Sequence, residues 1–305
     1  MFLRWEDIVS RAWVCSPLAL GWRTVAAYAG YARHLDWGNY WRLGKGPFVT
    51  TLYPLIITLL LPLLFGLPFA LALLLFLPAF AALPIGLAIG IVPARPVLEK
   101  IRAFWLIRLF IFNDALARDG YDADLDARLD DFTREVSAAL DEDLDEVLLV
   151  AHSNGSILAV PLLLRLIALR GGKLPEHFAM VTLGHCIPLL ACRRDAGWYR
   201  EELHALSTHD FRWYDFGSPP DGAAYHAVDP MRIVAPTSQV RLEMYSPRFH
   251  LFYDPATYHA GWANKYEIHF DYLRSGDRVS PVDYPSLTAS DRLISQSVAL
   301  FRELP

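Results

Sequence analysis

The sequence has few cysteines and no block of basic residues. Its three cysteines, Cys15, Cys186 and Cys192, show neither metal-site spacing nor a paired framework, which fits reduced thiols in a cytosolic setting. We therefore expect no metal or other cofactor. The net charge of -5 argues against nucleic acid as a partner. A secretory signal peptide is also missing, because charged residues interrupt the first apolar ones: Arg4, Glu6, Asp7 and Arg11.

Charge is absent from residues 46–94. A bilayer core about 30 Å thick needs about 20 helical residues, so this stretch is too long for one span. It suits two spans with a break near residues 66–68. Arginines and lysines flank both ends, which by the positive-inside rule places both ends in the cytoplasm. The alternatives are a buried hairpin of a soluble protein and a re-entrant segment that enters the membrane without crossing it.

The composition divides the chain into three parts. Residues 1–46 mix aromatic and basic side chains, which favours either a helix at a membrane interface or an amphipathic helix packed on the domain. Residues 47–94 are the predicted transmembrane hairpin. Residues 95–305 have a globular composition and are the predicted catalytic domain. For the location we expect a membrane, the bacterial inner membrane, with the catalytic domain facing the cytoplasm.

The globular part alternates strand-like and helix-like patterns. Apolar runs predict strands at 104–112, 147–150, 178–183, 211–216 and 248–253. Three- and four-residue spacing of apolar side chains predicts an amphipathic helix over 124–140, and a long apolar segment predicts another over 157–169. This alternation indicates an α/β fold with a mostly parallel sheet and flanking helices.

The stretch E-V-L-L-V-A-H-S-N-G-S-I-L-A, residues 146–159, combines a strand, a sharp turn and a helix, with Ser153 at the turn. This is the layout of a nucleophile elbow, in which a strained serine needs small neighbours two residues away on either side. Ala151 and Gly155 meet that need. The backbone amide of Asn154 is then an expected oxyanion donor. The alternative is a Ser-Gly loop without chemistry.

A nucleophilic serine needs a histidine, and the histidine needs a carboxylate. In a fold with this elbow the chain order is serine, acid, histidine, with the last two on loops after later strands. Asp221 follows the strand-like run 211–216 and is the favoured acid, with Asp215 inside that run as the competitor. Asp229 resembles a turn residue. Three histidines are candidate bases: His250, His259 and His269. We interpret His152 as a residue that packs at the elbow, and His185 as one that either lines the pocket or packs.

Three segments bear a family resemblance. V-A-H-S-N-G-S resembles the elbow of the α/β-hydrolase superfamily. F-R-W-Y-D-F-G-S-P-P-D-G-A-A-Y resembles the acid segment of intracellular lipases such as the DDHD family, and I-H-F-D-Y-L-R-S-G-D resembles their histidine segment. The resemblance covers roughly residues 104–275. It implies an α/β-hydrolase fold in which Asp221 is the acid and His269 the base.

The sequence departs from that family in one respect. No His-Gly pair is present to supply the second oxyanion donor from an earlier strand. Either the loop after residues 104–112, with Asn113 and Asp114, supplies this donor, or the chain starts downstream of the natural start.

The pattern as a whole predicts a membrane-anchored serine hydrolase. It would cleave a carboxylic ester through Ser153, His269 and Asp221, and the membrane anchor favours a lipid or other hydrophobic substrate. Acyl transfer to an alcohol is a related possibility. The alternative from another class is an inactive hydrolase-fold scaffold or lipid-binding protein of the membrane.

Overall fold

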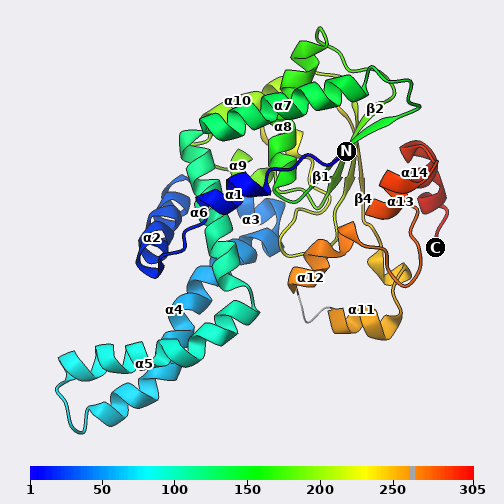
Figure 1. Ribbon diagram of the computed structural model, residues 1–305. Helices are drawn as coiled ribbons and strands as arrows, with labels where there is room; N and C mark the ends of the chain where they lie inside the picture. The colour runs from blue at the N-terminus through cyan, green and yellow to red at the C-terminus, as the bar shows by residue number, and fades with distance from the viewer. Residues whose placement is uncertain (262–264) are drawn as a thin grey trace.

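The computed structural model describes residues 1–261 and 265–305 as a mixed α/β protein (Figure 1). A four-stranded parallel sheet lies at one end of the molecule, and two long apolar helices project from the other end. The elements are, in order, α1 (Glu6–Ala12), α2 (Pro17–His34), α3 (Trp37–Leu43), α4 (Lys45–Leu73), α5 (Ala79–Lys100), α6 (Ala103–Asp119), α7 (Ala123–Ala139), β1 (Val147–His152), α8 (Gly155–Leu169), β2 (Phe178–Leu183), α9 (Pro188–Ala191), α10 (Gly197–Ser207), β3 (Arg212–Phe216), η1 (Pro230–Ile233), β4 (Arg241–Tyr245), η2 (Phe249–Leu251), α11 (Pro255–Gly261), α12 (Lys265–Phe270), η3 (Asp271–Leu273), α13 (Tyr284–Ala289) and α14 (Ile294–Arg302).

The sheet has the order β1-β2-β3-β4, with every pair parallel. Because each strand pairs with the next one along the chain, right-handed crossovers place the connecting helices on one face. That face packs against α8, α10 and α7, with Met180 and Trp213 at its centre. The alternate residues Val181 and Phe216 point to the other face, which α13 and α14 cover. The parallel, covered sheet confirms the predicted α/β class.

Two of the predicted strands are wrong. Residues 104–112 belong to helix α6, which packs against α2, α4 and α5. An apolar run of this length fits a buried helix as well as a buried strand, so its periodicity does not distinguish between the two. Residues 248–253 form the short helix η2 and its flanking turns. Among the described residues the sheet therefore begins at β1, and β1 is an edge strand.

The charge-free stretch forms two helices, α4 and α5, as predicted, but the break lies elsewhere. The chain turns after Leu73 and not at residues 66–68, and Pro54, Pro62 and Pro68 all lie inside α4. Neighbouring helices satisfy the backbone groups that such prolines free. A Cβ added to Gly86 would lie 2.4 Å from the Cβ of Ala70, so small residues bring the two helices close together.

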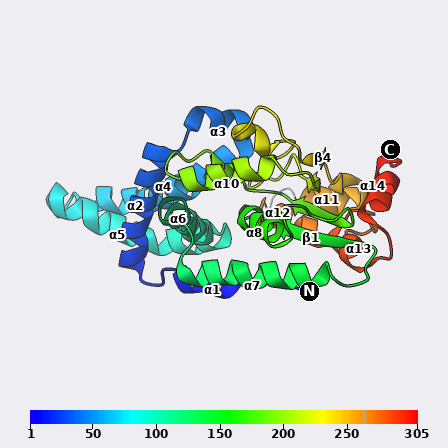
Figure 2. The ribbon, with the colours of Figure 1, turned by 90° about the horizontal axis from the view of Figure 1, so that it is seen from above.

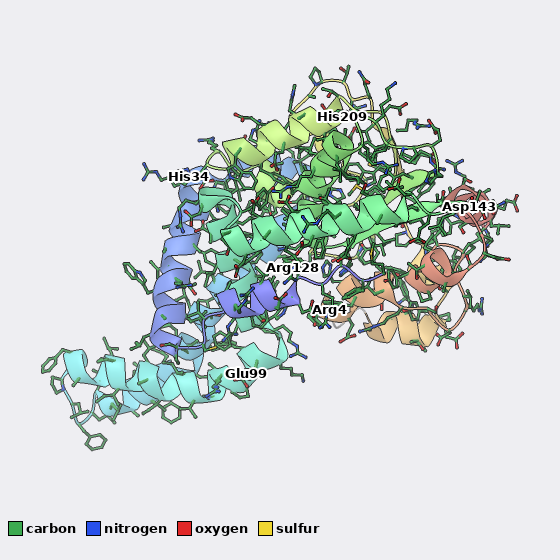
Figure 3. All side chains as sticks on the ribbon, turned by 45° about the horizontal axis from the view of Figure 1, so that its top comes forward. Arg4, His34, Glu99, Arg128, Asp143 and His209 are labelled. Atoms are coloured by element: carbon green, nitrogen blue, oxygen red, sulfur yellow. The ribbon has the colours of Figure 1, made fainter. Side chains whose placement is uncertain are left out.

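Both helices are long and apolar enough to cross a membrane. Only 17% and 28% of their most apolar 18-residue stretches are buried inside the protein. The hairpin extends away from the sheet, as the view from above also shows (Figure 2). Glu99 lies on α5 near its junction with the rest of the protein (Figure 3). A mostly exposed apolar surface of this size is compatible with membrane association.

The N-terminal segment forms α1, α2 and α3, and part of it packs on the domain. Tyr31 and Tyr40 are each 1% exposed, and the Arg193 guanidinium lies 4.6 Å from the centre of the Tyr31 ring. Trp22 on α2 is 74% exposed. The segment thus has a buried face, as the packing alternative predicts, and an outer face that carries exposed aromatic residues.

Candidate functional site

Ser153 lies at the turn between β1 and α8 with a backbone φ of 54°. This left-handed conformation is uncommon for a residue other than glycine, and it is the strained geometry expected of a nucleophile elbow. Three hydrogen bonds hold its backbone, one of which runs from the Ser156 N–H to the Ser153 carbonyl (3.0 Å). The Ser153 N–H donates to the carbonyl of Leu183 at the end of β2 (3.2 Å), and the Ser156 hydroxyl donates to the Ser153 carbonyl (2.6 Å).

The steric argument for small neighbours is only half right. Ala151 is 7% exposed and belongs to the core beneath the elbow. A Cβ added to Gly155, however, would meet nothing within 4 Å outside its immediate chain neighbours and its own helix backbone. Space is therefore not the reason for glycine at this position.

Ser153, His269 and Asp221 form a continuous hydrogen-bonded series. The Ser153 Oγ lies 2.8 Å from Nε2 of His269, and the His269 Nδ1 lies 2.8 Å from Oδ2 of Asp221. His269 comes from α12, and Asp221 comes from the loop that follows β3. Both side chains are buried, at 5% and 3% exposure. The fold thus brings together the three residues that were favoured from the sequence, although they are separated by 68 and 48 positions along the chain (221 − 153 and 269 − 221).

The surroundings of Asp221 favour its ionised form. Burial by itself would raise the pKa of this carboxyl. The charge of His269 and the hydrogen bond from it act in the opposite direction, and so does the Ala223 N–H, which donates to Oδ1 (2.8 Å). The net result is a pKa below the usual value. Asp221 is therefore a carboxylate that can orient His269 and stabilise its protonated form.

Asp215, the competing acid, has a different partner. It lies in β3 with 1% exposure, and its Oδ1 accepts a hydrogen bond from the Thr182 hydroxyl (2.6 Å). Burial raises the pKa of Asp215 to about 8. Its Oδ2 has no hydrogen-bond partner among the described residues and lies 3.9 Å from Nε2 of His185. That Nε2 makes its hydrogen bond with the Val228 carbonyl (3.1 Å). The structure thus pairs His269 with Asp221.

The other candidates lie outside this series. Asp229 caps the short helix η1 by accepting a hydrogen bond from the Met231 N–H (2.9 Å), as its turn-like sequence suggested. His250 lies on η2 and His259 on α11, and both are exposed. Neither of these two histidines is hydrogen-bonded to Ser153 or Asp221.

His152 contacts the histidine of the series directly. Its Nε2 lies 2.8 Å from the His269 carbonyl oxygen, and the two rings are 4.9 Å apart at their centres. Burial lowers the pKa of His152 to about 4, so the ring is neutral near pH 7 and donates its Nε2 proton to this carbonyl. The sequence suggested only packing for His152. Its position next to Ser153 in the sequence was the one feature that could have indicated a contact with the site.

Cys186 and Ser156 link the elbow to the loop after β2, and neither was predicted to do so. The Cys186 N–H donates to the Ser156 Oγ (2.9 Å), and that hydroxyl in turn donates to the Ser153 carbonyl. The Cys186 Sγ lies 3.7 Å from the Ser153 Oγ. Burial raises the pKa of this thiol to about 12, so it stays protonated and is no competing nucleophile.

The region where a second oxyanion donor is expected is occupied by a helix. Asn113 lies on α6 and not in a loop, is 1% exposed, and its Oδ1 accepts a hydrogen bond from Nδ2 of Asn154 (2.8 Å). The Asn113 Nδ2 is buried without a partner among the described residues. Asp114 instead binds the Arg193 guanidinium (2.8 Å). Of the two predicted sources, only Asn113 contacts the elbow.

The parts of the chain that the structure describes contain no group of three or more His, Cys, Asp or Glu residues that could hold a metal ion. The chain matches no family model, no curated protein and no solved structure.

Proposed function

We propose that this protein is a membrane-anchored serine hydrolase of the α/β-hydrolase type that cleaves a lipophilic carboxylic ester. The observation that carries the proposal is the series Ser153–His269–Asp221, with two 2.8 Å contacts and a strained serine. A serine becomes nucleophilic when a neighbouring base accepts its proton, and the base needs a third group to fix its tautomer. In this proposal Ser153 is the nucleophile, His269 is the base, and Asp221 is the third group.

The reaction proceeds in two halves. His269 accepts the Ser153 proton through Nε2 while Oγ attacks the ester carbonyl, and Asp221 stabilises the imidazolium that forms. His269 then gives the proton to the leaving alcohol as the C–O bond breaks, which leaves an acyl-serine. Water, activated by the same histidine, hydrolyses the acyl-serine and releases the acid. A second alcohol in place of water would give acyl transfer.

The oxyanion of the tetrahedral intermediate needs donors. The backbone N–H of Asn154, the N-cap residue of α8, has no intrahelical acceptor and is one donor. We assign the second to the side-chain amide of Asn113, because its Nδ2 is buried beside the elbow without an acceptor among the described residues. A buried donor without a partner is costly, and a developing oxyanion would satisfy it.

The hairpin supports the lipophilic substrate class. α4 and α5 would hold the site beside a bilayer, where lipid esters are concentrated. The positive-inside rule, applied to the flanking arginines and lysines, favours a cytoplasmic catalytic domain. The rival function is an inactive scaffold or lipid-binding protein. Its support is the edge position of β1, which leaves no earlier strand to carry an oxyanion loop.

Fluorophosphonate labelling of the detergent-solubilised protein separates the two functions, because the reagent reacts with activated serines. We expect labelling of the wild type, none of Ser153→Ala, and strongly slowed labelling of His269→Ala and Asp221→Asn. Heat-denatured wild type is the control for reaction that does not depend on the folded site. Absence of labelling in folded wild type would favour the scaffold.

A further inference from the structure

The end of the α4–α5 hairpin that joins the rest of the protein contacts the loop that carries Asp221 and the helix α12 that carries His269. We define the hairpin base as residues 44–53, where α4 begins, together with residues 101–105, where α5 ends and α6 begins. The Tyr53 hydroxyl donates to the Ile101 carbonyl (3.4 Å), which ties the two halves together. The hairpin base is thus one structural unit at the junction between the apolar helices and the rest of the protein (Figure 1).

The first half of the hairpin base supports the loop that carries the acid. The Thr50 hydroxyl donates to the Gly222 carbonyl (2.6 Å), and Gly222 directly follows Asp221. The backbones also meet closely here, since a Cβ added to Gly46 would lie 3.0 Å from the Gly222 Cα. This hydrogen bond joins residues 172 positions apart in the sequence and holds the loop against α4.

The second half supports the helix that carries the base. The Arg102 guanidinium lies 5.3 Å from the centre of the Tyr266 ring, and Trp105 meets the same ring edge-on at 5.6 Å. Tyr266 is on α12 three residues before His269, so the two side chains share a helix face. Arg102 has a left-handed backbone (φ 58°), which places it at the sharp junction between α5 and α6.

We infer that the hairpin base positions the proposed catalytic acid and base, with Thr50 acting through Gly222 on Asp221 and Tyr266 acting through α12 on His269. The inference rests on the proposed function. Neither residue touches the reacting atoms. Each restricts a segment whose displacement by a fraction of an ångström would lengthen a 2.8 Å contact of the series, and misplacement on that scale slows a reaction without weakening substrate binding. The hairpin is therefore part of the site's framework as well as an anchor.

The test compares paired variants on a soluble short-chain ester, p-nitrophenyl butyrate, which needs no delivery through a bilayer. Thr50→Val removes the hydroxyl at nearly constant volume, and we expect kcat to fall about tenfold with KM within about twofold. Thr50→Ser keeps a hydroxyl and should restore most of the rate. Thr58→Val is the matched control, because the Thr58 hydroxyl, farther along α4, has no partner among the described residues.

The histidine side is tested in the same way. Tyr266→Ala should lower kcat about tenfold, and Tyr266→Phe should restore it because both ring contacts remain. Fluorophosphonate labelling rates, normalised to folded protein, should follow kcat. Thr50→Val and Tyr266→Ala proteins that label like the wild type would overturn the inference. A wild type that does not label at all would overturn the proposed function instead, so the two failures are distinguishable.

Discussion

Two buried aspartate–histidine pairs lie in the same protein, and only one of them is hydrogen-bonded to Ser153. In the first pair, Asp221 and His269 are 2.8 Å apart and His269 continues to Ser153. In the second, Asp215 and His185 approach to 3.9 Å, without a hydrogen bond between them. All four side chains are buried, so burial alone does not distinguish the pairs.

Their polar partners distinguish them. The pKa of Asp221 is lowered by His269 and by the Ala223 N–H in spite of burial, whereas burial raises the pKa of Asp215 to about 8, with a single Thr182 hydroxyl in opposition. A buried carboxyl is ionised only where donors replace the lost water. The first pair is therefore suited to catalysis, and the second is a neutral part of the core.

The largest difference between the two pairs is expected when the carboxyl of each is replaced by an amide and kcat is compared. Asp221→Asn removes the group that fixes the His269 tautomer, and we expect kcat to fall about 10³–10⁴-fold. Asp215→Asn keeps an oxygen acceptor for Thr182, and kcat should stay within about threefold of wild type. Steady-state ester hydrolysis measures both. Comparable losses in the two variants would mean that Asp215 shares the role of Asp221.

The proposed reaction should also depend on an oxyanion donor from α6. Asn113→Asp keeps the oxygen that accepts from Asn154 Nδ2 and removes the amide donor, and kcat should fall about 10²-fold with little change in KM. Asn154→Ala is the matched control, because it breaks the same side-chain contact but leaves the Asn113 amide and the residue 154 backbone N–H. Equal losses in both variants would assign Asn113 a purely structural role.

A smaller effect is expected from His152 and His185, each of which binds a backbone carbonyl. His152 binds the carbonyl of His269, and His185 binds that of Val228. His152→Leu should lower kcat about tenfold because the His269 backbone loses its restraint. His185→Leu should change thermal stability but leave the kcat of folded protein near wild type. Unchanged kcat in His152→Leu would show that α12 is held in place without this bond.

The smallest effect is on stability and depends on pH. The Asp215 carboxyl has a pKa of about 8 in the folded protein, above its ordinary unfolded value of about 3.8. Between these two values the folded protein binds more protons, so stability falls as the pH rises. Asp215→Asn lacks this proton linkage. The difference in melting temperature, variant minus wild type, should therefore increase by a few degrees for each pH unit between about pH 5 and 8. A pH-independent difference would contradict the raised pKa.

Local patterns in the sequence were sufficient for several parts of the structure. The predicted strands 147–150 and 178–183 lie within β1 and β2, and the predicted helices 124–140 and 157–169 correspond to α7 and α8. Each of these segments has a clear period or a clear boundary. The run at 104–112 has neither, and it became a helix because α2, α4 and α5 surround it.

The candidate site divides in the same way. Chain order ranked Asp221 above Asp215, but it left three histidines open. The contact of His152 with the His269 carbonyl and that of Asn113 with Asn154 depend on how α12 and α6 meet the elbow at the end of β1, which no local pattern records.

The sequence by itself determined the strained serine between a strand and a helix and the presence of two apolar helices, because both follow from the chemistry of consecutive residues. Only the tertiary structure decided which carboxyl is ionised and which histidine reaches the serine. It also decided that the hairpin base supports both of their segments. Those outcomes depend on hydrogen bonds and desolvation among residues that are far apart in the chain.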